Sequence, residues 1–157
     1  MQSYRERLWP APWLFVSTAL VIPASILVFA PIDPVVGVVV ALVLYGGTIG
    51  ALLALSPVIE VVDGELRAGR AHIPLELVGE PTTHTGQQAF AERGPRLDAR
   101  AYLVIRGWVG DVVRVPIEDP EDPTPYWLLS SRRPNDIVAA IRGSRRRRGR
   151  PSERGEA

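Results

Sequence analysis

The chain has 157 residues, 46% of them hydrophobic, and its net charge of +1 conceals an uneven distribution. Seven of its 18 basic residues, all of which are Arg, lie in residues 142–157 with only 2 of its 17 acidic residues. Cysteine and lysine are absent, which excludes disulfides, thiolate metal sites, cysteine nucleophiles, Schiff-base lysines and a P-loop lysine. This length allows one ordinary domain, or a membrane part with one small domain.

Two long uncharged segments lie near the N-terminus. Residues 8–32 and 34–59 contain no charged side chain, and only Asp33 separates them. Because about 20 predominantly apolar residues can cross a bilayer as a helix, we expect transmembrane spans at about 10–30 and 35–56. The short turn at residues 31–34 predicts antiparallel helices, and Pro23 should kink the first span. A buried helix of a soluble domain is the alternative, but two such segments in succession argue against it.

The first apolar segment could also be a secretory signal peptide, because Arg5 and Arg7 precede it. It is longer than the roughly 7–15 apolar residues of a signal peptide, and cleavage after Ala30 would leave a proline at the new terminus, so a retained anchor is favoured. Arginines flank both spans, whereas the turn has none. The positive-inside rule therefore predicts a multi-pass protein of the cell membrane with both termini in the cytoplasm.

The second span contains Gly46 and Gly50, which are four residues apart. Small residues at this spacing allow two helix backbones to approach closely. Packing against the first span of the same chain is favoured, because that helix is tethered alongside. Homodimerisation through the second span is the alternative.

Residues 58–142 change to short alternating patterns, which predict a small, mainly β cytoplasmic domain. Strands are expected at 58–62, 65–68, 71–77, 101–106, 112–118 and 126–130, with Leu103 and Ile105 facing inward. The dipeptide Asp63-Gly64 is typical of a tight hairpin turn. Residues 79–100 predict a loop with a short helical turn near residues 87–92.

A C-terminal helix is expected to close this domain. Pro134 suits its first turn, and Ile137, Val138 and Ile141 form an apolar stripe at helical spacing. Gly143 suits a C-cap, so the helix should span residues 134–142. The expected organisation is therefore a flank and two-helix membrane hairpin over residues 1–57, a β-rich domain over residues 58–142, and a disordered basic tail over residues 143–157.

Four segments carry a resemblance to a known family: residues 4–9, 63–70, 100–103 and 122–128, with the last of these being the most specific. The chain resembles an uncharacterised family, a domain of unknown function, of small two-span membrane proteins from high-GC Gram-positive bacteria. The resemblance covers about residues 4–142 and implies no activity and no catalytic residues. The order of elements is also similar to that of membrane-anchored bacterial pleckstrin-homology-like modules, which implies a PH-like fold.

No pattern in the chain indicates an enzyme. His72 and His84 are the two histidines, and no spacing of acidic or histidine residues around them is typical of a metal site. The acidic residues 118–122 lack the spacing of a calcium loop and lie among prolines. No serine lies in a nucleophile elbow. We therefore expect no catalytic residue, no metal ligand and no cofactor.

The residues most typical of a binding surface are aromatic residues and arginines. The candidate contacts for a protein partner or for lipid are Trp108, Tyr126, Trp127, Arg132, Arg133, Arg145, Arg146, Arg147 and Arg148. A structural role is the alternative for the aromatic residues. The arginine run would bind phosphates without specificity, so anionic lipid is favoured over nucleic acid as its counter-charge.

Two functions fit these observations. The favoured one is an integral membrane protein that acts as a non-catalytic interaction or scaffolding module at the inner leaflet, with the bilayer and an unknown protein as partners. The alternative is an accessory subunit of a membrane enzyme or transporter. A transporter needs polar groups inside its spans, and these spans offer few.

Overall fold

The computed structural model describes residues 4–148 and divides the chain into two compact units. One unit, the hairpin, consists of residues 9–56. The other unit, the domain, combines the chain before residue 9 with the chain from residue 57 onward. The expected organisation grouped the N-terminal flank with the membrane hairpin. In the structure this flank belongs to the domain, where it forms a strand.

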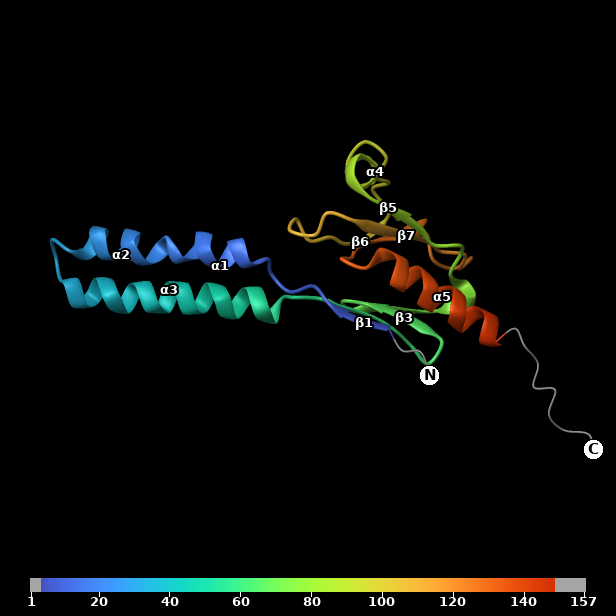
Figure 1. The fold of residues 1–157 in the computed structure, drawn as a ribbon, viewed down its shortest axis with the longest axis horizontal. Coiled ribbons are helices and arrows are strands. Elements are labelled where there is room, and N and C mark those ends of the chain that lie inside the picture. The colour runs from blue at the N-terminus through green and yellow to red at the C-terminus, as the bar shows by residue number, and fades with distance from the viewer. Residues whose placement is uncertain (1–3, 149–157) are drawn as a thin grey trace, which may run out of the picture. The chain divides into compact units, whose positions relative to one another are not determined.

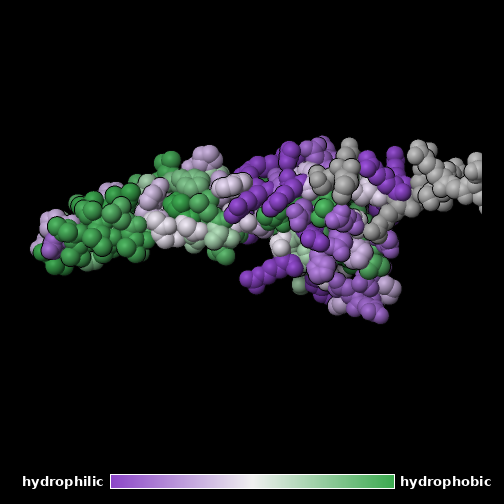
Figure 2. Space-filling model, turned by 90° about the horizontal axis from the view of Figure 1, so that it is seen from below, coloured by the Kyte–Doolittle hydropathy of each residue, from purple (hydrophilic) through white to green (hydrophobic). Residues whose placement is uncertain are grey.

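The hairpin contains three helices, α1 (Pro12–Ala19), α2 (Val21–Phe29) and α3 (Pro34–Ala54). Taken together, α1 and α2 give a segment of 18 residues, and α3 has 21 residues, so both are long and apolar enough to cross a membrane. Only 6% and 11% of these two segments are buried, unlike the core helix of a soluble protein. Figure 2 shows apolar surface over this unit and mainly hydrophilic surface over the domain.

The expected kink at Pro23 is present as a break between α1 and α2 at Leu20. Proline has no N–H to donate to the carbonyl of Ala19, and its ring crowds that carbonyl. The expected tight turn is also present. It ends at Asp33, whose carboxylate accepts a hydrogen bond of 2.8 Å from the Val35 N–H and so caps α3.

Helices α2 and α3 pack closely beside this turn. A Cβ placed on Gly37 would lie 3.2 Å from Phe29 Cβ and 3.3 Å from Ile26 Cα. The favoured interpretation of Gly46 and Gly50 as contacts with the first span is wrong, because no atom of that span lies within 4 Å of a Cβ placed on either. The tight turn brings the start of α3 against α2, and Gly37 and Ala41 are the buried residues of α3.

The domain contains two four-stranded sheets and a long C-terminal helix (Figure 1). The first sheet is antiparallel throughout, with the order β1 (Tyr4–Arg7), β2 (Val58–Val62), β3 (Glu65–Ala68) and β4 (Ala71–Pro74). The second sheet has the order β5 (Thr82–His84), β7 (Val112–Pro116), β8 (Tyr126–Ser130) and β6 (Tyr102–Val104), and its β6 runs parallel to β8. The 3-10 helix η1 (Leu75–Leu77) follows β4, α4 (Gly86–Arg93) follows β5, and α5 (Pro134–Arg148) follows β8.

All six expected strands are present, although some are shorter. The strand expected at 71–77 ends at Pro74 and continues as η1, with Ile73 and Leu75 buried as the alternation predicts. The helical turn expected near residues 87–92 is α4. The turn residues Asp63 and Gly64 have φ angles of 53° and 81°, as a type I′ hairpin turn requires. Strands β1 and β5 were not expected.

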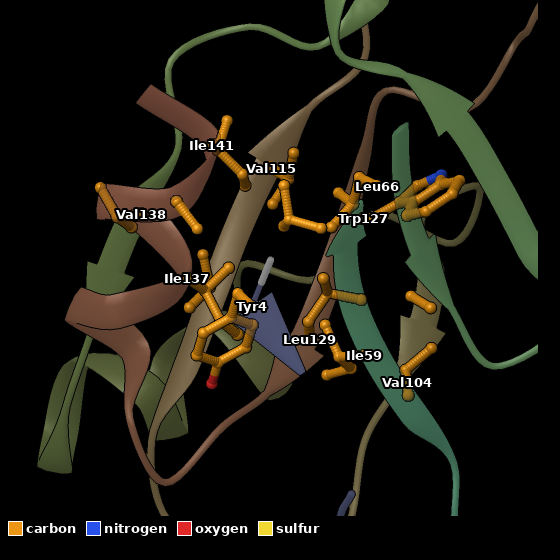
Figure 3. Close-up of a cluster of buried hydrophobic side chains, with 14 of the residues drawn as sticks. Tyr4, Ile59, Leu66, Val104, Val115, Trp127, Leu129, Ile137, Val138 and Ile141 are labelled. Carbon is orange, nitrogen blue, oxygen red and sulfur yellow. The ribbon is translucent and has the colours of Figure 1, made fainter. Parts of the chain in front are cut away.

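The main core lies between the two sheets and α5 (Figure 3). Its labelled side chains come from every strand except β4 and β5, and from α5. Ile137, Val138 and Ile141 form the expected apolar stripe, and Ile137 and Ile141 are completely buried. The prediction that this helix closes the domain is therefore confirmed.

A second, smaller core covers the other face of the second sheet. Ala89 of α4 packs there with Val112, Tyr126 and Leu128. Both faces of β7 and β8 therefore carry buried side chains. The expectation that Leu103 points inward is wrong: Leu103 is 43% exposed, whereas its neighbour Val104 is 5% exposed.

The last helix is longer than expected. α5 continues through Gly143 to Arg148, so the predicted end at residue 142 and the predicted disorder of residues 143–148 are wrong. An interior glycine costs a helix only about 1 kcal/mol, and arginine is a good helix former. Ion pairs from Arg142 and Arg145 to Glu80 hold the last turns against the domain. The remainder of the expected tail, residues 149–157, lies outside the described residues.

Candidate functional site

The aromatic candidates on β8 are buried. Trp127 lies in the main core, with its ring centroid 5.1 Å from that of Tyr102. Tyr126 lies in the second core, where its hydroxyl accepts a hydrogen bond of 2.8 Å from the Asp98 N–H. The guanidinium carbon of Arg114 lies 3.9 Å from the Tyr126 ring centroid. Neither aromatic side chain offers a surface to a partner, so the structural interpretation of these two residues holds.

Trp108 is partly buried and packs against the main core. Its indole packs against the core residues, and its Nε1 is buried without a hydrogen-bond partner among the described residues. The guanidinium carbon of Arg106 lies 5.9 Å from the indole centroid, within the range of a cation–π contact. Of the two sequence interpretations, core packing is therefore the one that the contacts support.

A buried acid that sequence reasoning missed joins β1 to the start of α5. Glu6 is 6% exposed, and its carboxylate accepts hydrogen bonds from Tyr4 Oη at 2.6 Å, Ser131 Oγ at 2.6 Å and Arg132 N at 2.9 Å. Ser131 Oγ in turn accepts a hydrogen bond of 2.9 Å from the Arg133 N–H. Burial, and then the hydrogen bond to Glu6, hold the pKa of Tyr4 well above its ordinary value of 10.0.

The side chains of Arg132 and Arg133 lie on the surface beside this cluster. The guanidinium of Arg133 lies 5.4 Å from the Tyr4 ring centroid and 3.9 Å from a carboxylate oxygen of Asp136. An exposed ion pair of this length contributes little stability. Both candidates are therefore exposed charges.

A second buried acid holds α4 on the second sheet. Glu92 is 2% exposed and forms ion pairs of 3.1 Å with Arg114 and 3.6 Å with Arg96. Its neighbour Arg93 donates a hydrogen bond of 3.3 Å to the Val109 carbonyl. Pairing offsets the cost of burying the charge, so this cluster is structural. It leaves Phe90 on the outside, 67% exposed.

The C-terminal arginines come together with two residues that the sequence did not single out, Arg142 and Glu80. Glu80 and the arginines Arg142, Arg145 and Arg146 line a surface hollow of about 360 Å³. Arg142 donates from Nε to Glu80 Oε1 at 2.5 Å, and a second nitrogen of the same guanidinium pairs with that oxygen. Arg145 donates a hydrogen bond of 3.3 Å to the Gly79 carbonyl and lies 4.0 Å from Glu80 Oε2.

Arg147 is exposed near the end of α5, and Arg148 is its last residue. The expected basic run is therefore a helical surface, where arginines three and four residues apart share a face. Within residues 4–148, no group of three or more histidine or acidic side chains could hold a metal ion. His84 has Thr82 Oγ1 at 3.1 Å from its Nε2, and His72 is exposed.

A family whose members are described as proteins of unknown function, DUF3093, matches residues 3–141. The match covers most of the chain, so the chain belongs to this family, as its resemblance indicated. No curated protein matches the chain. No solved structure matches it either, so the PH-like fold stays a prediction.

Proposed function

We propose that this member of the DUF3093 family is an integral membrane protein whose domain is a non-catalytic interaction module at the inner leaflet. The observation that carries the proposal is the pairing of β1 with β2. Arg7 is the register partner of Val58, and the Leu8 N–H donates a hydrogen bond of 3.0 Å to the Pro57 carbonyl. The hairpin therefore leaves the domain and returns to it at adjacent backbone positions.

A chain that leaves and returns at one point crosses a bilayer an even number of times. The intervening residues contain two segments of sufficient length and hydropathy. Two crossings therefore account for the whole of residues 9–56, and they keep β1 and the rest of the domain on the same side. This pairing excludes a single crossing, so it supports the two-span topology together with hydropathy.

The same strand argues against removal of the first helix as a signal peptide. Cleavage after Ala30 would separate β1 from the domain. The domain would then lose Tyr4 and Leu8, which are 8% and 0% exposed, and the carboxylate of Glu6. Loss of such buried groups destabilises a small domain by several kcal/mol. A retained anchor is therefore the consistent alternative.

The arginines supply the orientation. Arg5 and Arg7 precede the first span and Arg67 and Arg70 follow the second, whereas the turn contains Asp33 and no basic residue. The positive-inside rule places the domain and both termini in the cytoplasm. The domain would then present its exposed arginines to the inner leaflet and the cytosol. Tethering raises the effective concentration of such a surface for partners at the membrane.

Cysteine labelling in intact cells tests the topology, because the natural chain has no cysteine to remove. A single cysteine at Asp33→Cys should react with a membrane-impermeant maleimide from outside. A single cysteine at Arg147→Cys should react only after lysis. The cysteine-free natural chain is the control, and external labelling of Arg147→Cys would contradict the proposed orientation.

Co-purification in detergent tests the interaction role. The full-length protein should retain a protein partner that a variant ending at residue 56 loses. Both proteins carry the same hairpin, so a difference between them is assigned to the domain. Catalytic turnover by the purified protein would contradict the non-catalytic role.

A further inference from the structure

We infer that the basic end of α5 docks an acidic segment of a soluble partner protein; this inference rests on the proposed cytoplasmic orientation and names the partner. The basic end consists of Arg142, Arg145, Arg146 and Arg147. The first three of these line the hollow of about 360 Å³ that also contains Glu80.

The arginines of the hollow already bind a carboxylate of the same chain. The guanidinium of Arg142 directs two of its nitrogens at one carboxylate oxygen of Glu80, and Arg145 approaches the other oxygen. A guanidinium fork of this kind matches the planar carboxylate group. Glu80 is thus an internal example of the ligand. A carboxylate from another chain can pair with the same arginines.

The charge of the site exceeds what the domain neutralises. Glu80 contacts two of the three arginines in the hollow, and the Oε1 of Glu118 lies beside Gly79. Arg146 forms no ion pair with another described residue, although it lines the same hollow. Three guanidinium groups therefore line the hollow with one carboxylate, and the excess positive charge attracts an acidic ligand.

The location within the domain favours a soluble partner over the bilayer. The Leu75 N–H donates a hydrogen bond of 2.9 Å to the carbonyl of Gly64, in the turn that ends β2. The hairpin is connected at the other end of β2, at Pro57. η1 leads directly to Gly79 and Glu80, so the basic end of α5 lies at the end of the domain opposite its connection to the hairpin. Figure 1 shows α5 running along the domain to this end.

The test uses the full-length protein in nanodiscs of zwitterionic lipid. The probe is a fluorescent peptide of about ten glutamates, and fluorescence anisotropy measures its binding over a range of salt concentrations. The natural chain should bind the peptide, and salt should weaken the binding. The double variant Arg145→Gln/Arg146→Gln should weaken it by about fivefold, because each lost exposed ion pair contributes a small share of the affinity.

Two further variants separate a local site from net charge. The double variant Arg67→Gln/Arg70→Gln removes the same charge from β3 and the turn that follows it, and it should change the affinity by less than about twofold. Glu80→Gln removes the competing internal carboxylate, so it should strengthen peptide binding. A role of Glu80 in folding alone would not produce that gain. Unfolding midpoints of all variants establish that each one is folded.

Several outcomes would overturn the inference. They are equal weakening in the two double variants, weaker binding in Glu80→Gln, or tighter binding of a single-stranded oligonucleotide of equal charge. Loss of peptide binding in nanodiscs of anionic lipid would also overturn it, because the bilayer would then occupy the site. None of these outcomes changes the cysteine-labelling pattern, so failure here is distinguishable from failure of the proposed topology.

Discussion

Removal of the Glu6 carboxylate should destabilise the domain more than any other single change in β1. In Glu6→Ala, three donors lose their acceptor: the hydroxyls of Tyr4 and Ser131 and the N–H of Arg132. A hydrogen bond to a charged group contributes about 1.5–3 kcal/mol, and a buried donor left unpaired costs about 1–3 kcal/mol. Because such terms are not additive, we expect a loss of about 3–5 kcal/mol.

Glu6→Gln keeps the size of the side chain and one acceptor oxygen, so it should cost only about 1–2 kcal/mol. The matched control is Arg5→Ala on the same strand. The Arg5 side chain is 74% exposed and lies 3.8 Å from Glu60, so its loss should cost less than about 0.5 kcal/mol. Urea unfolding of the full-length protein in detergent, followed by near-UV circular dichroism, measures all three variants. A loss below about 1 kcal/mol for Glu6→Ala would refute the role assigned to this cluster.

Four other expectations follow from the contacts. Replacing residues 9–56 by a short turn should give a soluble folded domain, because Leu8 and Pro57 are already hydrogen-bonded. A fragment of residues 57–148, which lacks β1, should fail to fold. Circular dichroism and gel filtration check both proteins. Ile137→Asp should lower the unfolding free energy by about 3 kcal/mol or more, with the exposed Ala139→Asp as its control in urea melts. Because the pKa of Tyr4 is raised in the folded domain, the Tyr4 hydroxyl ionises at a lower pH in the unfolded chain. The free energy of unfolding should therefore fall as the pH rises above about 10. Melts from about pH 8 to 12 should show a smaller decrease for the Tyr4→Phe variant than for the natural chain. Gly37→Val should disrupt the hairpin in detergent, since its Cβ would press on Phe29 and Ile26, whereas Gly46→Val should leave an isolated hairpin intact.

The parts of the fold that the sequence predicts are those set by local patterns. The alternation in residues 58–68 and the Asp63-Gly64 turn predict β2, β3 and their connection, because strand period and turn conformation depend on adjacent residues. The two apolar helical segments and the break near Pro23 are predicted for the same reason, because each depends on adjacent residues. The family is also recognisable from short segments, without knowledge of any contact.

The parts that the sequence missed depend on distant partners. β1 has four residues, and its strand partner β2 follows some fifty residues later, so it reads as a basic flank. The alternation of Tyr4, Glu6 and Leu8 with Arg5 and Arg7 was the available signal. The last turns of α5 depend likewise on Glu80, which no local pattern connects to Arg142.

The candidate site shows the same difference between what local patterns predict and what distant contacts determine. The sequence identified candidate residues of types suited to binding. Three of these residues, Trp108, Tyr126 and Trp127, pack in the cores. An aromatic residue followed by another in a strand can serve either sheet face, and in β8 both faces are covered. The arginines were identified as charges, but the carboxylate that organises them was found only in the structure.

The position of β1 also changes what residues 4–8 do. A basic flank before a membrane span needs only charge, and any arginine would serve. Here the outward-facing Arg5 and Arg7 alternate with side chains that complete the core and bind the segment before α5. Under the proposed topology, orientation in the membrane and closure of the domain use the same short strand, on opposite faces. A change of Arg5 should affect the proposed topology with little effect on folding, whereas a change of Glu6 should affect folding with little effect on topology.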